Sequence, residues 1–348
     1  HECPTDHTSP VSQTAKLKSA GNCQNVAEGR AGVAVMTMGR VVDRICALVA
    51  IPLLIVAAGC AHGLNTGAES RLTPLRVALF PAGNTLPVEA AATRGIFERH
   101  GLWVQITAGQ DLPLFMAAQS KGRYDIAMSV PTLVLLGAQR GLDLQIVSST
   151  AQQTAERPNA VWITRDASIR SLADLRGKTI AVPSLTGIIT DSVVYLLQRN
   201  GLTRDDVHLV QTPCPAMGDQ LQAGRVDAVV ATLPFSTAIA ARGFFVHDDV
   251  IVEAVRDASG GTVSEAITTV WTVSRRFADE RPDVVTAWRA SLHEAIDALR
   301  ADSEGARRLM AEWLKMPRAV LDQAPLPDWT VDISARQLKP YVAIARNV

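Results

Sequence analysis

The sequence is poor in aromatic residues, in cysteine and in net charge, and these shortages exclude several classes of function. Aromatic residues make up 5% of the 348 residues and are scattered, so the chain offers no platform on which nucleic-acid bases could stack. Lysine plus arginine and aspartate plus glutamate both number 34, and no basic cluster stands out. We therefore expect no nucleic-acid partner. The length and the 47% hydrophobic content suffice for two domains, each with its own core.

Cysteine and histidine spacing excludes a metal site, and the sequence contains no motif of a catalytic centre. None of the five cysteines forms a CxxC pair, and no histidine spacing completes a zinc site. The motifs GxSxG and HExxH are missing, as is a Cys/His nucleophile pattern. Gly177-Lys178-Thr179 resembles the end of a P-loop, but Leu172 stands where that motif needs glycine. We predict neither a cofactor nor a metal, and no enzymatic activity. The cysteines are Cys3, Cys23, Cys46, Cys60 and Cys214.

The first 59 residues have the pattern of an export signal. Residues 1–35 are polar and aperiodic, and we interpret them as a leader that is not native or is disordered. Residues 36–59 contain arginines, then an apolar run at 45–58, then Gly59 before Cys60. That order is typical of a signal peptide, and the run is shorter than the roughly 20 residues that span a bilayer.

Ala57-Ala58-Gly59-Cys60 resembles a bacterial lipobox, whose cysteine is lipidated and becomes the mature N-terminus. Lipidation at Cys60 would place the protein outside the cytoplasm, anchored to the cell membrane, with residues 60–74 as a tether. The family's usual Leu is Ala57 here, and a plain signal peptide or an uncleaved anchor is the alternative. After cleavage Cys214 would be the other remaining cysteine, so no disulfide is expected, and we interpret it as a structural thiol.

From residue 74 onward short β-type runs alternate with helical segments, which predicts an α/β architecture with mostly parallel sheets. Two such units follow each other. Two further extended runs, residues 160–164 and 267–273, stand between them, and we interpret these as crossovers between two lobes. The chain beyond residue 279 is predicted to be helical. The predicted strands are residues 75–80, 103–107, 125–129, 144–149, 179–182, 207–211 and 226–231, and the predicted helices are 86–96, 111–120, 131–140, 187–200, 281–299 and 304–314.

An ordered set of segments resembles the nitrate/sulfonate/taurine type of ABC-transporter substrate-binding proteins, which includes pyrimidine-binding relatives. Residues 86–104, containing Gly95-Ile-Phe-Glu-Arg-His-Gly101, resemble the family's first helix. Residues 169–183, with Asp174-Leu-Arg-Gly177-Lys178, are the best match. Residues 122–127, 201–207 and 223–228 complete the set.

The resemblance implies a type II periplasmic-binding-protein fold, in which two α/β lobes are joined by a two-strand hinge. Lobe 1 would comprise residues 75–162 and 270–348, and lobe 2 residues 163–269. It also implies a monomeric receptor that binds a small organic or anionic solute, such as a sulfonate or nitrate, and delivers it to the permease of an ABC importer. The alternatives are an enzyme of the thiamine-pyrimidine synthase type and a binder of a neutral heterocycle such as a pyrimidine or flavin. That synthase group carries a cysteine-rich motif that this sequence lacks.

Four loops are the candidate ligand site, because ligands of open α/β sheets bind beyond the carboxyl ends of the strands. These mouth loops are residues 81–85, 129–132, 184–187 and 232–235. None contains Lys or Arg, so an anion would rest on helix N-termini and backbone N–H groups. The alternative role for each hydroxyl is simple N-capping. The candidate ligand-binding residues are Asn84, Thr85, Ser129, Thr132, Ser184, Thr186, Gly187, Thr232 and Pro234.

Three further features favour a structural role. His247, Asp248 and Asp249 lack a fourth ligand at a metal-binding spacing and are predicted to form a solvated loop. Trp162 and Trp271, which lie on the two crossovers, are predicted to pack in a core or hinge rather than against a ligand. Leu233 replaces a glutamate that is frequent in the family, which argues against an aminated ligand.

Substitution Cys60→Ala should release the protein from the membrane fraction, because no other residue would accept the lipid. Fractionation and immunoblotting measure this, with Cys214→Ala as a control that stays anchored. A Cys60→Ala protein that remains in the membrane fraction with its apolar run uncleaved would show that the lipoprotein interpretation is wrong.

Overall fold

The structure, a computed structural model, describes residues 72–346. The predicted leader, the signal peptide, Cys60 and most of the tether therefore lie outside the described residues. Strand β1 begins at Thr73, inside the range predicted for the tether. Within residues 72–346 no helix is both long enough and apolar enough to cross a membrane.

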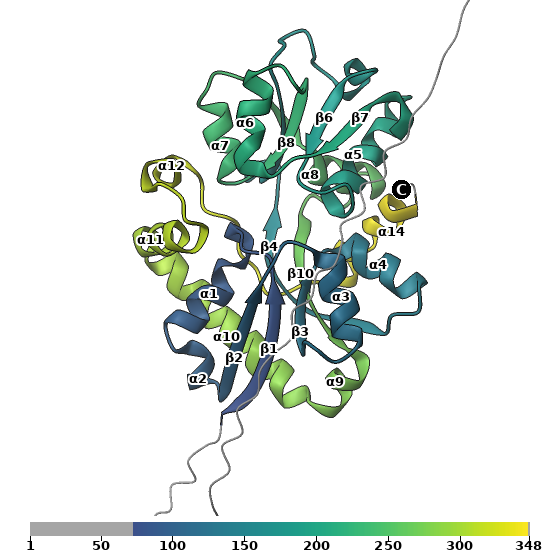
Figure 1. Ribbon diagram of the computed structural model, residues 1–348. Helices are drawn as coiled ribbons and strands as arrows, with labels where there is room; N and C mark the ends of the chain where they lie inside the picture. The colour runs from purple at the N-terminus through teal and green to yellow at the C-terminus, as the bar shows by residue number, and fades with distance from the viewer. Residues whose placement is uncertain (1–71, 347–348) are drawn as a thin grey trace, which may run out of the picture. The chain divides into compact units, whose positions relative to one another are not determined.

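Two five-stranded sheets share one strand order (Figure 1). In each sheet the first three strands in this order are parallel to one another. The fourth strand, β10 in the first sheet and β5 in the second, is antiparallel to both of its neighbours. The first sheet has the order β2 (Leu102–Ala108), β1 (Thr73–Leu79), β3 (Ile126–Ser129), β10 (Ala266–Ser274) and β4 (Leu144–Gln153). The second has the order β7 (His208–Gln211), β6 (Thr179–Val182), β8 (Ala228–Thr232), β5 (Ala160–Thr164) and β9 (Phe245–Asp249).

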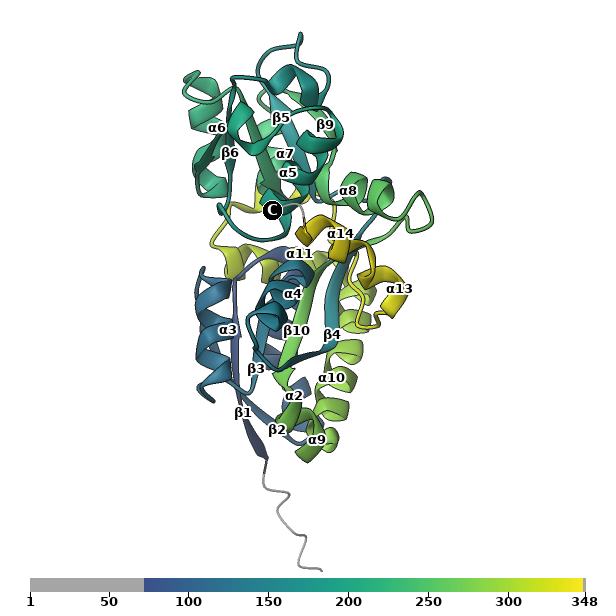
Figure 2. The same ribbon diagram turned by 90° about the vertical axis from the view of Figure 1, so that its right-hand side faces the viewer.

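Helices cover both faces of each sheet, as Figures 1 and 2 show. We call the first sheet with its helices lobe 1 and the second sheet with its helices lobe 2. Lobe 1 contains η1 (Gly83–Thr85), α1 (Leu86–Thr93), α2 (Ile96–Arg99), α3 (Leu112–Ser120), α4 (Pro131–Gln139), α9 (Arg275–Glu280), α10 (Pro282–Ala301) and α11 (Ser303–Leu314). Lobe 2 contains η2 (Leu172–Leu175), α5 (Ile188–Arg199), η3 (Arg204–Asp206), α6 (Cys214–Gln222), α7 (Phe235–Ala240) and α8 (Val250–Ala258). Three more helices follow, α12 (Arg318–Gln323), α13 (Ala335–Leu338) and α14 (Pro340–Arg346).

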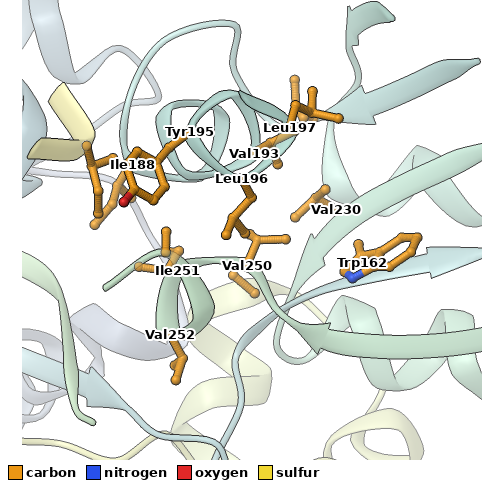
Figure 3. Close-up of a cluster of buried hydrophobic side chains, with 14 of the residues drawn as sticks. Trp162, Ile188, Val193, Tyr195, Leu196, Leu197, Val230, Val250, Ile251 and Val252 are labelled. Carbon is orange, nitrogen blue, oxygen red and sulfur yellow. The ribbon is translucent and has the colours of Figure 1, made fainter. Parts of the chain in front are cut away.

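Strand β5 is buried on both faces of the second sheet because its side chains alternate between two cores. Trp162 packs into the cluster formed with α5 and α8, as Figure 3 shows. Val161 and Ile163 point to the opposite cluster, against α6 and α7. Because both faces of this strand are covered, residues 160–163 are all apolar and do not alternate with polar residues.

Trp271 lies on β10 in the core of lobe 1, fully buried, edge-on to Trp288 with ring centroids 5.2 Å apart. Its Nε1 donates to Thr150 Oγ1 over 3.2 Å. Trp162 is also buried and stacks on the His247 ring at a centroid distance of 3.7 Å. The prediction that both tryptophans pack in a core is confirmed.

The two sheets are connected by residues 154–159, between β4 and β5, and by residues 250–265, between β9 and β10. The runs at 160–164 and 267–273 are therefore sheet strands, each paired with two neighbours, and the connecting segments lie directly beside them. Our sequence interpretation of these runs as the crossovers themselves needs that correction. Because each run pairs with a strand on either side, the sheets satisfy the backbone N–H and C=O groups of both runs.

The Asp249 carboxylate joins the two connections. Its Oδ2 accepts from the N–H groups of Asn159 (2.7 Å) and Ala160 (2.8 Å), at the start of β5. Its Oδ1 accepts from Ile251 and Val252 at the start of α8, and from Gln153 Nε2 of β4 over 2.7 Å. The prediction of a solvated loop at residues 247–249 is wrong, because Asp249 is 3% exposed and residues 245–249 form edge strand β9.

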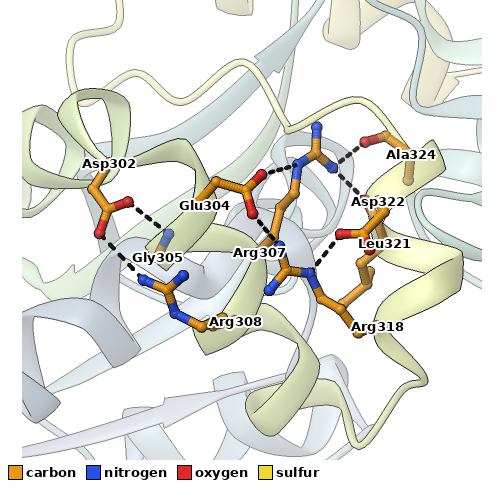
Figure 4. Close-up of polar contacts among 9 residues, drawn as sticks. All are labelled: Asp302, Glu304, Gly305, Arg307, Arg308, Arg318, Leu321, Asp322 and Ala324. Atoms are coloured by element: carbon orange, nitrogen blue, oxygen red, sulfur yellow. Dashed lines mark hydrogen bonds and ion pairs between the residues drawn. The ribbon is translucent and has the colours of Figure 1, made fainter.

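The segment after α11 is fixed by arginines. Arg307 donates to the carbonyls of Leu321 and Ala324, and Arg318 pairs with Glu304 and Asp322, as Figure 4 shows. Beyond this cluster Trp329 is buried and its Nε1 donates to the Gly83 carbonyl over 2.9 Å. The C-terminal segment thereby holds η1 in place at the carboxyl end of β1.

We expect Asp249→Ala to lower the free energy of unfolding by about 3–5 kcal/mol, because it leaves several buried N–H donors without an acceptor. Urea denaturation followed by circular dichroism measures the change. The matched control is Asp248→Ala, whose exposed neighbouring side chain should change stability by less than about 0.5 kcal/mol. Equal effects of the two substitutions would contradict the role assigned to Asp249.

Candidate functional site

The mouth loops follow β1 and β3 of the first sheet and β6 and β8 of the second, and in each sheet these two strands are parallel neighbours. Each loop leads into a helix: η1 and α1, α4, α5 and α7 respectively. The structure thus places all four loops at carboxyl strand ends, two in each lobe.

Loop 81–85 contributes an amide and a hydroxyl with different surroundings. Asn84 Nδ2 lies 3.3 Å from Thr268 Oγ1 and 3.2 Å from Thr269 Oγ1, on β10. Thr85 is fully buried, and its hydroxyl bonds the backbone of Phe80 and Ala82. In this conformation Thr85 therefore stabilises the loop, whereas Asn84 is partly accessible.

Asn159 links loop 81–85 to loop 232–235. Its Oδ1 accepts from the N–H of Leu233 over 3.0 Å, and its Nδ2 lies 3.5 Å from Asn84 Oδ1. A cavity of about 50 Å³ lies beside these three residues and is bordered by residues 325–328. This volume suits one or two water molecules, whereas solute sites occupy about 300 Å³ or more. In this conformation the cavity is therefore too small for a solute.

Loops 129–132 and 184–187 meet between α4 and α5. A Cβ atom built on Gly187 would lie 3.8 Å from Leu133 Cδ1 and 3.9 Å from Val130 Cγ2. Gly187 has a φ of +99°, a backbone conformation that residues other than glycine rarely adopt. Ser129 is fully buried and its hydroxyl lies 3.1 Å from Met116 Sδ. Lobes 1 and 2 thus touch at this pair of loops.

Asp191, one turn into α5, faces Thr132 of α4 across this contact. The carboxylate is 2% exposed and Thr132 is fully buried. Among the described residues neither Asp191 Oδ2 nor Thr132 Oγ1 has a hydrogen-bond partner. Burial raises the pKa of Asp191 to about 6, and the nearby Thr132 hydroxyl and the positive charge of Arg204 oppose that rise only in part.

The helices that follow the mouth loops begin without a side-chain cap. The N-cap residues of α1, α4, α5 and α7 are Thr85, Val130, Gly187 and Pro234, and none of their side chains accepts from its helix. Elsewhere α3, α8, α9 and α11 are capped by aspartate or serine, whereas α2, α6, α10 and α12 also begin without a side-chain cap. The first-turn N–H groups at the mouth are therefore left to another acceptor.

The hydroxyls of Ser184 and Thr186 contact each other rather than the N–H groups of α5, whereas the Ser184 carbonyl accepts from the Thr190 hydroxyl of α5. Their hydroxyl oxygens lie 3.4 Å apart, and the Thr186 N–H donates to Ser184 Oγ over 3.3 Å. Thr186 is exposed and Ser184 partly so. Simple capping, the alternative considered from the sequence, is thus not the role that these hydroxyls have in the structure.

Thr232 and Pro234 form the fourth loop. Thr232 ends β8, and its hydroxyl lies 3.9 Å from Cys214 Sγ. Burial raises the pKa of the Cys214 thiol, which keeps it protonated and unreactive near neutral pH, as expected for a structural thiol. Pro234 is buried directly before α7.

A second hollow, a groove of about 520 Å³, lies between the C-terminal ends of α5 and α8. Its charged residues neutralise each other: Arg199 pairs with Asp257 at 2.9 Å and Arg256 with Glu253 at 2.5 Å. It lies away from the carboxyl ends of the strands, so we do not place the solute there. Residues 72–346 contain no cluster of three or more His, Cys, Asp or Glu side chains that could hold a metal ion.

Sequence reasoning missed Asn159, Asp191 and Asp249. Asp191 lies in the first turn of a predicted helix, where an acidic residue is ordinary and is taken to be solvated. Asn159 follows a proline in a polar stretch, and Asp249 follows another aspartate. A local signal existed for Asp249 alone, because an aspartate directly before the apolar Val250-Ile-Val252 is typical of an N-cap.

The shared strand order and the four loops at strand ends define a type II periplasmic-binding-protein fold. The family model described as NMT1/THI5 like matches residues 82–306, and the chain belongs to this family.

Three proteins illustrate the similarity. The chain is 26% identical to a Brachyspira hyodysenteriae protein named as an ABC transporter periplasmic binding protein, over 79% of either chain. It is 32% identical to a Haemophilus influenzae protein named as a thiamine biosynthesis protein, over 40% of this chain and 43% of that one. The structure resembles the periplasmic aliphatic sulphonate binding protein SsuA from Escherichia coli with a TM-score of 0.64, at 18% identity, covering 79% of this chain and 91% of SsuA. The last likeness concerns the fold alone.

The stability of the protein should fall as pH rises through 6, and Asp191→Asn should remove part of that fall. A carboxyl group whose pKa is raised on folding contributes stability below its unfolded pKa and loses it above its folded pKa. Between pH 4 and pH 7 we expect the free energy of unfolding of the wild type to fall by about 2–3 kcal/mol more than that of Asp191→Asn. Urea denaturation at both pH values measures this, and parallel pH profiles of the two proteins would contradict it.

Proposed function

We propose that this protein is the solute-binding receptor of an ABC importer and that it binds a small organic or anionic solute of the sulfonate or nitrate type. Its family and the name carried by its Brachyspira relative support this assignment. The observation that carries it is the set of uncapped helix N-termini at the four mouth loops.

The N-terminus of α5 is the strongest acceptor-binding element of the four. Helix α5 has 12 residues and a glycine N-cap, and no proline removes an N–H group from its first turn. By contrast, α1 and α4 carry proline in the first turn and α7 starts after Pro234. Aligned N–H groups and the helix dipole stabilise an anion without a basic side chain. This fits loops that contain neither Lys nor Arg.

Solute capture is proposed to close lobe 1 on lobe 2 about the connections at 154–159 and 259–265. The lobes are not divided at 162/163 and 269/270, the boundaries expected from the sequence, because these would cut through β5 and β10. In the described conformation α4 and α5 already touch through Gly187, Val130 and Leu133. This contact and the small cavity beside Asn84 are what a closed arrangement would produce. The open arrangement would expose the mouth loops to the solute.

The proposed partners are the importer's permease and, through lipid on Cys60, the membrane. A receptor tethered by a short flexible segment stays at high local concentration near its permease, which favours delivery of the solute. We propose that the receptor acts as an extracytoplasmic monomer.

A neutral heterocycle such as a pyrimidine is the second candidate ligand. The partial relative named as a thiamine biosynthesis protein points toward it, as do the amide groups of Asn84 and Asn159 beside the cavity. Amides offer both a donor and an acceptor, which suits the edge of a ring with nitrogen atoms.

Ser184→Ala and Thr186→Ala should each weaken solute binding, by about 0.5–1.5 kcal/mol for a neutral ligand and about 1.5–3 kcal/mol for an anion. A thermal-shift screen of sulfonates, nitrate, pyrimidines and flavins selects the ligand, and calorimetry then measures its affinity. Ser168→Ala, an exposed serine of lobe 2, is the matched control and should change nothing. Unchanged affinity in both loop variants would remove loop 184–187 from the binding site.

A further inference from the structure

We propose that Asp191 and Thr132 form a subsite for an N–H donor group of the solute, such as a protonated amine or an amino group on a heterocycle. The inference rests on the proposed solute-binding function and deepens it. It assigns one end of the solute to a specific pair of side chains, one from each lobe.

The position of the pair supports this role. Thr132 lies in the first turn of α4 and Asp191 in the first turns of α5, directly behind loops 129–132 and 184–187. Both side chains are at least nine-tenths buried. The close approach of Gly187 to Leu133 and Val130 encloses them between the lobes. A group bound here would contact both lobes at once and would favour their closed arrangement.

The unused hydrogen-bonding capacity of the pair defines the chemistry of its ligand. Neither Asp191 Oδ2 nor the Thr132 hydroxyl has a partner within hydrogen-bond distance among the described residues, although the hydroxyl lies near enough to the carboxylate to lower its pKa. A buried carboxylate is stabilised most by a charged or polar N–H group, because hydrogen bonds in which one partner is ionised are stronger than those between neutral groups. A sulfonate or nitrate oxygen at this position would meet like charge, so the acidic part of a solute belongs at the first-turn N–H groups of α5 instead.

Comparison with Asp249 argues against a purely structural role for Asp191. Asp249 is equally buried, but it accepts five hydrogen bonds from Gln153, Asn159, Ala160, Ile251 and Val252. A structural aspartate in this fold is thus saturated with donors. Asp191 lacks such donors at Oδ2, and an unpaired buried acceptor lowers stability unless a ligand fills the gap.

Two matched pairs of probes test the subsite by calorimetry at pH 7.5. In each pair an amino group replaces a methyl group of similar size: 2-aminoethanesulfonate against propane-1-sulfonate, and 4-amino-2-methylpyrimidine against 2,4-dimethylpyrimidine. The wild type should bind the amino member of at least one pair about 10- to 100-fold more tightly. Asp191→Asn should abolish this preference, and Thr132→Val should reduce it by about 2- to 10-fold. The control Asp205→Asn, an exposed aspartate of lobe 2, should keep it.

Stability separates binding from a structural role. Asp191→Asn should melt no lower than the wild type at pH 7.5, whereas a structural aspartate would lower the melting temperature when replaced. Equal affinity for both members of each pair, or an unchanged preference in Asp191→Asn, would overturn the subsite and leave the receptor function standing. Failure of the wild type to bind any of the four probes would overturn the subsite and the proposed ligand classes together.

Discussion

The arrangement of the mouth depends on one buried carboxylate, that of Asp249. The chain passes twice between the sheets, and each passage brings backbone N–H groups into an apolar interior: those that open β5 and those that open α8. Such groups must find an acceptor, and a single ionised side chain serves them all. Because Asp249 fixes Asn159, it also fixes the amide that bonds Leu233 and approaches Asn84. The junction between the lobes and two of the mouth loops therefore form one hydrogen-bonded network.

Four uncapped helix N-termini come together at the mouth, although α2, α6, α10 and α12 also begin without a side-chain cap. Away from the mouth, Asp111, Ser274 and Asp302 cap α3, α9 and α11 with their side chains. At the mouth the chain places Val130, Gly187 and Pro234 at the N-cap, residues that cannot provide such an acceptor. An N-cap residue without an acceptor costs about 1 kcal/mol relative to a capping residue, and a glycine such as Gly187 only about a few tenths. An external acceptor recovers that free energy when it binds.

Much of the fold could be predicted from the sequence, because apolar runs and glycine stops are local signals. Residues 179–182 form a strand with the predicted bounds, residues 160–164 are extended as predicted but belong to a sheet, and α3 begins at Leu112, one residue after the predicted start. Edge strand β9 escaped prediction because Phe245 and Val246 are half-exposed and charged residues follow them, which resembles a loop. The four loops were located correctly at strand ends, but their hydroxyls could not be sorted. Whether Thr85 or Thr186 faces solvent depends on how each loop folds back on itself: Thr85 bonds the backbone of Phe80 and Ala82, and Thr186 bonds Ser184. Residue types alone do not show which of these local bonds forms.

Asp191 and Asp249 show how one chemical group acquires two roles from its surroundings. The pKa of either side chain is raised to about 6, because burial outweighs the groups that lower it: backbone N–H groups for Asp249, and the Thr132 hydroxyl and the charge of Arg204 for Asp191. In the proposed subsite, the missing hydrogen-bond donor at Asp191 Oδ2 lets the protein select among solutes. A solute with an N–H group completes the carboxylate's hydrogen bonds, whereas one without it leaves a buried charge unpaired. Sites that demand a hydrogen bond in this way reject ligands that cannot make it far more strongly than apolar pockets discriminate by size. Leu233, which replaces a glutamate frequent in the family, then does not argue against an aminated solute, since Asp191 of α5, in the same lobe, supplies the carboxylate.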